Sequence, residues 1–342
     1  MKAGLLFGPG DLRVVDAPLP EPGPDDAILR IMRFAPYGTD IATFQNRGGR
    51  YVASYPTGFG ADIAGVVTAI GANVKTVRIG DRVSALALAH CGHCANCRKG
   101  RTNLCLDPAF RMPPRMAVAQ EFARLQARQL ARLPDGVSFD DAAMLGGIVD
   151  ALNAWGKMKP EAGEPVAIVG VGAMGWGAIA AAKALGHPVI AIGGTGTRVD
   201  LARACGADHV LPITAYDEDV SARALALAPG GVGAIMETSA TDWGVKQGFK
   251  IAAPGARIVT TGAPGGIPAS GWEVVGKELA IFGSRAGHDQ EGALRLIAAG
   301  KIDLKPTITH RMPLADLPKA FSLLTGPDSR NVGRIMIDVT AS

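Results

Sequence analysis

Apolar and polar positions follow two different rhythms along this chain. In the first third, short β-branched stretches such as Ala27–Met32 and Ile63–Ile70 are separated by clusters of Pro, Gly and Asp, as strands and turns are. After Asp140 the pattern changes to strand, glycine turn, helix and strand, which is typical of a parallel sheet covered by helices. We therefore expect an α/β protein in which a β-rich domain precedes a doubly wound parallel sheet.

Six candidate strands fall in the second part of the chain, and six is the number that a complete dinucleotide-binding sheet contains. They are Val166–Val169, Val189–Ile192, His209–Leu211, Ala234–Glu237, Arg257–Thr261 and Ala280–Phe282.

The last part of the chain has a helical pattern, Ala293–Ile297, then a polar loop and a final strand, Arg334–Val339. We expect a first domain over residues 1–148, a dinucleotide-binding domain over 149–288, and a tail over 289–342 that returns to the first domain.

The loop after the first of the six strands has the spacing G-x-G-x-x-G and opens a helix. Gly170, Gly172 and Gly175 fill the glycine positions, with Ala173 and Met174 between the last two. The first glycine permits a tight turn, the second lets a pyrophosphate approach the backbone, and the third lets helix and strand pack closely. The helix N-terminus adds N–H groups and a partial positive charge. This context predicts that these five residues bind a nicotinamide dinucleotide.

No carboxylate follows the second strand, where an NAD-binding domain usually has an Asp or Glu on the ribose hydroxyls. The chain has Gly193, Gly194, Thr195 and Arg198 there instead. The space beside these glycines, the two hydroxyls of Thr195 and Thr197, and the guanidinium of Arg198 suit a 2′-phosphate, so we expect NADP(H) to be preferred over NAD(H). The alternative is that Arg198 only stabilises the start of the next helix.

Four of the five cysteines lie close together, within a segment of about residues 90–106. Cys91, Cys94, Cys97 and Cys105 have the spacing C-x2-C-x2-C-x7-C, which suits a tetrahedral zinc ion. In the cysteine run of bacterial iron–sulfur proteins, three residues separate the last two cysteines and a proline follows the last one. Here seven residues separate the last two cysteines, and Leu106 follows Cys105. Four protein ligands leave no open position for a substrate. We therefore expect one structural zinc per chain.

The charge and composition of the chain indicate which classes of binding partner it is not expected to have. The 35 Lys and Arg residues exceed the 31 Asp and Glu residues by only 4, and no stretch gathers them into a basic face. We expect no nucleic-acid partner. The N-terminus lacks the pattern of a signal peptide, and no apolar run is long enough to span a membrane. We expect a cytoplasmic enzyme with a small-molecule substrate.

Together these features resemble the medium-chain dehydrogenase/reductase superfamily, in its zinc-containing alcohol dehydrogenase branch. The resemblance covers nearly the whole chain and includes, besides the glycine loop and the cysteine lobe, the runs Gly38-Thr39-Asp40, Gly65-Val66-Val67, Gly80-Asp81-Arg82-Val83 and Gly206-Ala207-Asp208-His209. It implies a GroES-like catalytic domain joined to a Rossmann domain. It also implies a homodimer or homotetramer.

The chain departs from that branch at the catalytic zinc. The family's Cys in C-G-[ST]-D is Tyr37, its His in G-H-E is Ala61, and its Glu is Asp62. Near the third ligand position, Met144–Ile148 offers no ligand side chain. Because a catalytic zinc needs about three protein ligands, we expect no catalytic metal. The alternative is that Asp62, His90 and Asp150 rebuild a site in space.

The hypothesis that follows is an NADPH-dependent reductase of an activated C=C or C=N bond, because metal-free members of the superfamily are often such reductases. Tyr37 is the candidate proton donor or oxyanion partner and Thr39 its relay, or Tyr37 only fills the space of the lost zinc. Asp40 and Asp62 orient polar groups, or are simply held by Arg and backbone N–H groups. One rival is an alcohol dehydrogenase or carbonyl reductase that uses Tyr37 and Thr39. Another is a non-catalytic NADPH sensor.

Three further positions follow from the resemblance. Thr261 and Gly262, after the fifth strand, are expected to present backbone groups to the nicotinamide carboxamide. Arg334, in the last strand, is expected to face the pyrophosphate, or else to form a surface salt bridge.

Overall fold

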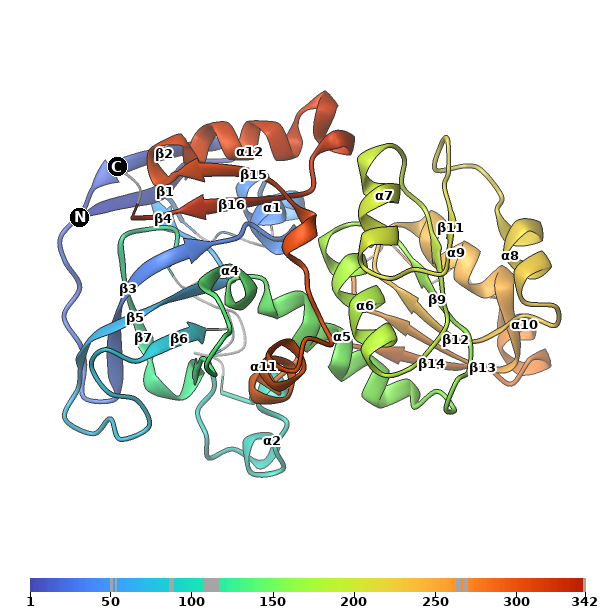
Figure 1. The fold of residues 1–342 in the computed structure, drawn as a ribbon, viewed down its shortest axis with the longest axis horizontal. Helices are drawn as coiled ribbons and strands as arrows, with labels where there is room; N and C mark the ends of the chain where they lie inside the picture. Colours follow the sequence, from blue (N-terminus) through green and yellow to red (C-terminus); the bar gives the residue numbers. More distant parts are fainter. Residues whose placement is uncertain are drawn as a thin grey trace. The chain divides into compact units, whose positions relative to one another are not determined.

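The computed structural model describes residues 1–49, 52, 54–85, 89–107, 117–262, 266 and 270–340. The chain forms two compact units, each assembled from separate segments (Figure 1). The first unit comprises Met1–Gly146, Gln290–Ala298 and Ile308–Ser342, and the second comprises Gly147–Asp289 and Ala299–Thr307.

The first unit is built on two sheets. The smaller has the order β2-β1-β4, and the larger runs β15-β16-β3-β5-β6-β8, with β7 also paired to β3. The predicted strand at Ala27–Met32 extends to Asp26–Phe34, and the one at Ile63–Ile70 has the predicted bounds. The strands are β1 (Lys2–Gly8), β2 (Asp11–Asp16), β3 (Asp26–Phe34), β4 (Thr57–Gly58), β5 (Ile63–Ile70), β6 (Arg82–Ala85), β7 (Phe122–Gln126), β8 (Leu130–Arg132), β15 (Ile308–Pro313) and β16 (Arg334–Asp338).

Helices and an aromatic cluster close the core of this unit. Phe59 packs edge-on against Phe34 and Phe321, with ring centroids 6.2 and 5.3 Å apart. Phe321 lies on a helix of the tail, so β15, β16 and this helix join residues far apart in sequence. The helices are α1 (Gly38–Phe44), α2 (Ala95–Arg98), α4 (Phe139–Ala142), α11 (Gln290–Ala298) and α12 (Leu317–Thr325).

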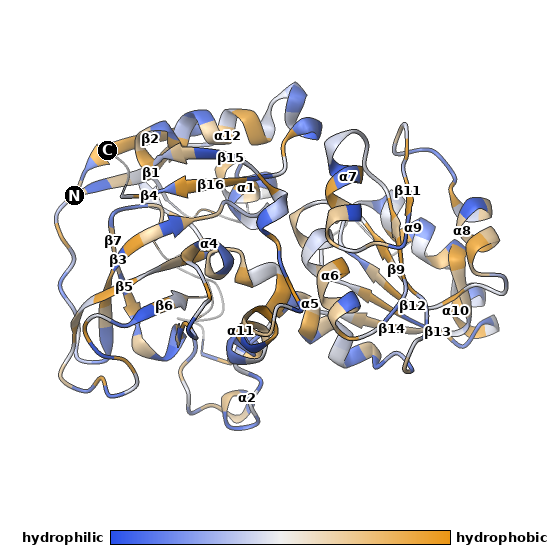
Figure 2. Cartoon of the chain, viewed as in Figure 1, coloured by the Kyte–Doolittle hydropathy of each residue, from blue (hydrophilic) through white to orange (hydrophobic). Residues whose placement is uncertain are grey.

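The second unit is a six-stranded sheet in the order β11-β10-β9-β12-β13-β14, and every described pair is parallel. Strands β9 and β10 are buried at every position, as expected for a parallel sheet with helices on both faces. The strands of this sheet are largely hydrophobic (Figure 2). The strands are β9 (Val166–Val169), β10 (Val189–Ile192), β11 (His209–Leu211), β12 (Val232–Glu237), β13 (Ala252–Thr260) and β14 (Ala280–Gly283).

The order of these strands places a change of direction beside β9. The chain moves outward from β9 to β10 and β11, then crosses back to β12 on the other side of β9. Ligands of such sheets bind beyond the carboxyl ends of the strands at this switch point. The helices are α5 (Leu145–Met158), which starts at the boundary of the units, and α6 (Ala173–Ala184), α7 (Thr197–Ala204), α8 (Ser221–Leu227), α9 (Asp242–Ile251) and α10 (Gly271–Gly276).

The tail does not return to the first unit as one piece, so the expected segment 289–342 needs correction. Residues 299–307 belong to the second unit, where Ile302, Leu304 and Thr307 are buried. Their short helix η4 (Lys305–Thr307) packs on α7. The sequence pattern shows the type of an element but not which core receives so short an apolar segment.

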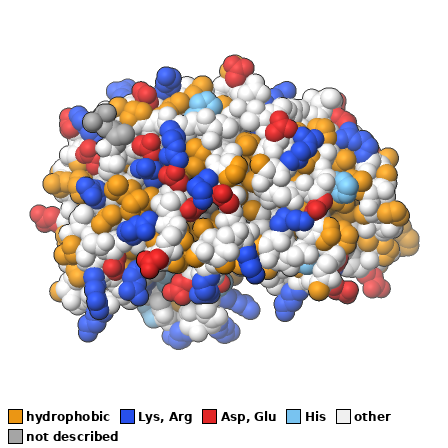
Figure 3. Space-filling model, in the orientation of Figure 1, with side chains coloured by type: hydrophobic (Ala, Val, Ile, Leu, Met, Phe, Trp, Pro, Cys, Tyr) orange, Lys and Arg blue, Asp and Glu red, His pale blue; other side chains and the backbone are white. Residues whose placement is uncertain are grey.

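No helix among the described residues is long and apolar enough to cross a bilayer. On the face drawn in Figure 3, Lys and Arg side chains alternate with Asp and Glu side chains.

Candidate functional site

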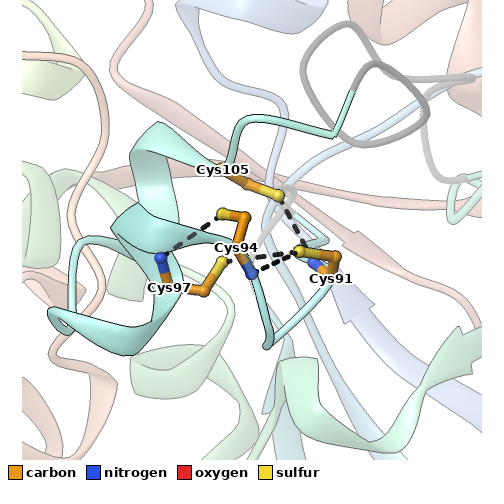
Figure 4. Close-up of side chains that lie close together, drawn as sticks. All are labelled: Cys91, Cys94, Cys97 and Cys105. Carbon is orange, nitrogen blue, oxygen red and sulfur yellow. Dashed lines mark hydrogen bonds between the residues drawn. The ribbon is translucent and has the colours of Figure 1, made fainter.

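The four cysteines of the lobe lie close enough to share one metal ion (Figure 4). The Sγ atoms of Cys91, Cys94, Cys97 and Cys105 all lie within 4.8 Å of one another, and those of Cys91 and Cys97 are 3.9 Å apart. A tetrahedral zinc with Zn–S bonds of about 2.3 Å requires S···S separations of about 3.8 Å. The arrangement therefore fits a four-thiolate zinc ion.

Backbone N–H groups prepare these thiols for a cation. Cys94 is the N-cap of α2, and its sulfur accepts from the N–H groups of Leu106 at 3.4 Å and Cys97 at 3.5 Å. These bonds, with that of Leu106 the larger effect, lower the pKa of Cys94 to about 6. Burial raises the pKa of Cys97 to about 12, so this thiol loses its proton only when a cation replaces it.

Close backbone approach explains two of the three glycines in the cofactor loop. Gly170 has φ +110°, a backbone conformation that residues with a side chain rarely adopt. A Cβ on Gly175 would lie 1.9 Å from the carbonyl oxygen of Gly170, so only glycine lets α6 begin this close to β9. Thr238, which follows β12, donates from its hydroxyl to the same carbonyl oxygen at 2.8 Å.

The middle glycine faces open space. Gly172 is the N-cap of α6, and a Cβ built on it would meet nothing within 4 Å. It offers no side-chain oxygen to the N–H groups of the first turn, which Ala173 and Met174 begin. An open N-terminus of a helix, at the switch point of a parallel sheet, fits a pyrophosphate.

The segment after β10 lies beside this loop. A Cβ on Gly194, which has φ +77°, would lie 2.2 Å from Cγ2 of Val171. Gly193 also has a positive φ, Thr195 is partly exposed, and Arg198 stands in the first turn of α7. The carbonyl of Arg198 accepts from the indole N–H of Trp176 at 3.4 Å, which ties α7 to α6.

A buried glutamate was missed by the sequence reasoning. Glu237 ends β12 and is fully buried; its Oε1 accepts from the N–H of Ser239 at 2.7 Å. Burial raises the pKa of this carboxyl. Its backbone oxygen accepts from both the N–H and the hydroxyl of Thr261, each at 3.0 Å. The signal was available, because a Glu directly follows the apolar run Ala234–Met236.

Gly262, which follows β13, lies close to the segment after β12. A Cβ built on it would lie 2.4 Å from Cβ of Ala240, so the backbone after β13 packs tightly against the backbone after β12. Thr261 and Gly262 thus lie at the carboxyl end of the sheet, on the same side as the glycine loop.

In the first unit, Tyr37 and Asp40 form the start of α1. Tyr37 is the N-cap, and Asp40 accepts from its backbone N–H at 2.8 Å while donating its own N–H to the Tyr37 carbonyl at 2.9 Å. Asp40 is 1% exposed. Thr39 lies between them, partly exposed. Asp40 is therefore held by a backbone N–H group, as one of the two interpretations of the sequence expected.

Asp62 takes up the space in front of Gly146. A Cβ on Gly146 would lie 2.3 Å from one carboxylate oxygen of Asp62 and 2.6 Å from the other. The Gly146 N–H hydrogen-bonds to this carboxylate. Asp62 is buried, and burial raises its pKa to about 6, with Arg334 and the Gly146 N–H acting in the opposite direction.

Arg334, the first residue of β16, is 4% exposed, so a surface salt bridge is wrong for this residue. Its Nη2 lies 3.8 Å from Oδ2 of Asp62, and its guanidinium carbon lies 5.6 Å from the ring centroid of Tyr37. Within the described residues, none of its three guanidinium nitrogens has a hydrogen-bond partner. Asp62 and Arg334 are thus a buried pair, and the partly buried Tyr37 lies next to Arg334.

The sequence left open a metal site rebuilt from Asp62, His90 and Asp150. In the described part of the chain, only the cysteine lobe gathers three or more His, Cys, Asp or Glu side chains at metal-binding distances. Asp62 and His90 lie outside those groups, and Asp150 accepts from the N–H of Gly287 at 2.7 Å instead. The alternative of Asp62, His90 and Asp150 as ligands stays a prediction.

Comparison with known families and proteins agrees with this geometry. Residues 23–135 match the alcohol dehydrogenase GroES-like domain, and residues 173–299 match the zinc-binding dehydrogenase family. The chain is 30% identical to an L-threonine 3-dehydrogenase of Pyrococcus horikoshii, over 91% of each chain. It is 27% identical to a sorbitol dehydrogenase of Bacillus subtilis, over 94% of this chain and 92% of that protein.

Solved structures show the same fold. A proposed zinc-binding dehydrogenase of Sinorhizobium meliloti with NADP bound superposes with a TM-score of 0.88, at 25% identity over 99% of both chains. A cobalt- and zinc-bound alcohol dehydrogenase of Pyrobaculum aerophilum gives 0.85, at 28% identity over 99% of both chains. The chain therefore belongs to the zinc-containing alcohol dehydrogenase branch of the medium-chain dehydrogenase/reductase superfamily, and it is an oxidoreductase.

Proposed function

We propose that this oxidoreductase uses NADPH to reduce an activated C=C or C=N bond of a small molecule, with one structural zinc and no catalytic zinc. The observation that carries the proposal is the position of Asp62. Its carboxylate lies against the backbone of Gly146, close in sequence to the position where the resemblance implies the third zinc ligand. Tyr37 and Ala61 stand at the positions of the first two ligands. One carboxylate is fewer than the three ligands that a catalytic zinc needs.

The second unit fits a nicotinamide dinucleotide. The open N-terminus of α6 at Gly172 would hold the pyrophosphate, and the segment from Gly193 to Arg198 would hold the adenosine ribose. The absence of a carboxylate from that segment, and the NADP bound to the Sinorhizobium meliloti relative, support NADP(H). When bound, the reduced cofactor supplies a hydride.

The residues of the first unit decide which acceptor can be reduced. Without a Lewis acid, transition-state stabilisation of several kcal/mol is lost, so an electron-poor bond is the better substrate. The oxygen or carbon left after hydride addition needs a hydrogen-bond donor within reach. Tyr37, with Thr39 beside it, would serve as that donor to the oxygen, and Asp40 would fix Tyr37 through its backbone N–H.

A second candidate function is alcohol oxidation or carbonyl reduction with Tyr37 and Thr39 in place of the metal. The relatives favour it, because sorbitol and L-threonine 3-dehydrogenases are named for the oxidation of alcohols. The third candidate is an NADPH-binding sensor without catalysis.

A substrate panel separates the three functions. The zinc-loaded protein is assayed with NADPH and enones, iminium ions and aldehydes, and with NADP and secondary alcohols. The proposal expects turnover of enones or iminium ions. Activity confined to alcohols and aldehydes would establish the second function. Transfer of deuterium from labelled NADPH to any member of the panel would exclude the sensor, and no transfer to any member would support it.

A further inference from the structure

The buried pair of Asp62 and Arg334, beside Tyr37, contains a carboxyl oxygen that the proposed reaction has not used. Oδ2 of Asp62 is buried and, among the described residues, has no hydrogen-bond partner. A buried carboxylate normally satisfies both oxygens, because an unpaired one costs free energy. Oδ1 and Oδ2 both lie close to Gly146, so a side chain there would displace the group.

We propose that Asp62 is the proton donor of the reaction, while Tyr37 hydrogen-bonds the substrate oxygen. This inference rests on the proposed reduction, and it identifies the acid that completes it. In the sequence, Asp62 stands in the motif that resembles the family's metal-ligand motif G-H-E. In the structure, its Oδ2 lies 3.8 Å from Nη2 of Arg334, whose guanidinium carbon lies 5.6 Å from the ring centroid of Tyr37. A protonated carboxyl there can deliver a proton to an atom bound in the same place.

The protonation step involves no change of oxidation state in the protein. After hydride addition the substrate carries an electron pair on the carbon or nitrogen next to the reduced centre, or on a conjugated oxygen. The O–H bond of Asp62 breaks, its electron pair stays on the carboxylate, and the proton forms a new bond to the substrate. Water then returns a proton to Asp62.

The groups around Asp62 keep its carboxyl protonated up to about pH 6. Burial favours the neutral acid, whereas the Arg334 guanidinium on β16 and the Gly146 N–H favour the carboxylate. The guanidinium of Arg334 lies over the ring of Tyr37, the N-cap residue of α1. The balance leaves the pKa of Asp62 at about 6. An acid with a pKa near the working pH is an efficient proton donor.

The test compares wild type with Asp62→Asn, using the panel substrate that wild type reduces best. General acids contribute roughly 100- to 10,000-fold, so kcat of D62N should fall at least about 100-fold. KM should change far less. Wild-type kcat should fall as the pH rises above about 6, and this limb should be missing from the residual rate of D62N. The solvent deuterium isotope effect should rise in D62N, because protonation becomes slower than hydride transfer.

Two control variants and an infrared measurement distinguish failure of this inference from failure of the proposed function. Asp62→Glu should restore part of the rate, and Asp141→Asn, which alters another buried carboxyl that caps α4, should keep the wild-type pH profile. Infrared titration of the free zinc-loaded protein should show a carboxyl band near pH 6 that D62N lacks. Reduction by wild type with an unchanged kcat and pH profile in D62N would overturn the inference alone. Failure of the whole panel would overturn the proposed function and the inference together.

Discussion

At the scale of single residues, Asp62 and Gly146 depend on each other. The sequence shows that Ala61 and Gly146 cannot bind a metal, but it does not show that the neighbouring carboxylate turns against Gly146. Residues 62 and 146 are far apart along the chain, and their contact depends on how β5 and α5 are placed. For the same reason the sequence does not show that Arg334 is buried beside Asp62, which follows from the position of β16 in the sheet.

Asp62 should make the stability of the protein depend on pH. Its pKa is raised from 3.8 to about 6, so the fold favours the protonated form. This contribution is fully present below about pH 4 and is lost as the pH rises to about 6, a change of about 3 kcal/mol. D62N has no proton to lose, so its free energy of unfolding relative to wild type should rise by about that amount from pH 4 to pH 7. Urea denaturation across this range measures it, and a constant difference would refute the pKa assignment.

Gly146→Ala should destabilise the first unit. The new Cβ would lie 2.3 Å from a carboxylate oxygen of Asp62, and such overpacking costs about 1–3 kcal/mol. Gly156→Ala is a matched control in the same helix, because a Cβ there would meet nothing within 4 Å. It should be neutral or stabilise the protein by up to about 1 kcal/mol. Thermal unfolding of both variants would contradict this account if G146A were the more stable.

At the scale of elements, periodicity predicted the second unit closely. Strands β9, β10 and β11 have the predicted bounds, because each is a short, largely apolar run with Pro or Gly directly beside it. Strand β13 starts at Ala252, five residues before the predicted Arg257, although Pro254 and Gly255 interrupt the pattern. Pairing of Ala252 with Val232 holds this interrupted stretch in the sheet, and tertiary pairing of this kind is not visible in periodicity.

The two glycines of the cofactor loop should respond differently to alanine. Gly175→Ala places a Cβ 1.9 Å from the Gly170 carbonyl oxygen, so both stability and NADPH affinity should fall. Gly172→Ala meets no protein atom within 4 Å, so the free energy of unfolding should change by less than about 1 kcal/mol. NADPH affinity of G172A should nevertheless fall at least tenfold, because the methyl group faces the pyrophosphate. Calorimetric titration with unchanged affinity in G172A would argue against a pyrophosphate at this helix.

Arg198 should decide between the two nicotinamide cofactors. A hydrogen bond to a charged group contributes about 1.5–3 kcal/mol, so Arg198→Ala should weaken NADPH binding roughly 10- to 100-fold and leave NADH binding unchanged. Arg203→Ala on the same helix removes an exposed arginine that pairs with Asp200, and it should affect neither cofactor. Equal losses for NADPH and NADH in R198A would show that Arg198 only supports the start of α7.

At the scale of the whole molecule, the fold of the family is retained although Tyr37 and Ala61 stand at positions where the resemblance implies metal ligands. The chain retains the GroES-like domain, the dinucleotide-binding sheet and the cysteine lobe of its family, and the described residues keep a close four-thiolate cluster. Local motifs with fixed spacing made these parts predictable from the sequence. The substrate remains outside such motifs, because the residues around the site come from separated segments of the chain.

The metal content of the purified protein tests the central claim most directly. After dialysis against a weak chelator, plasma mass spectrometry should return about one zinc per chain, and Cys97→Ser should lose it, since four thiolates form the lobe. D62N should still hold one zinc, because Asp62 is not a ligand in this account. Two tightly held zinc ions per chain, with one of them lost in D62N, would contradict the claim that this protein works without a catalytic metal.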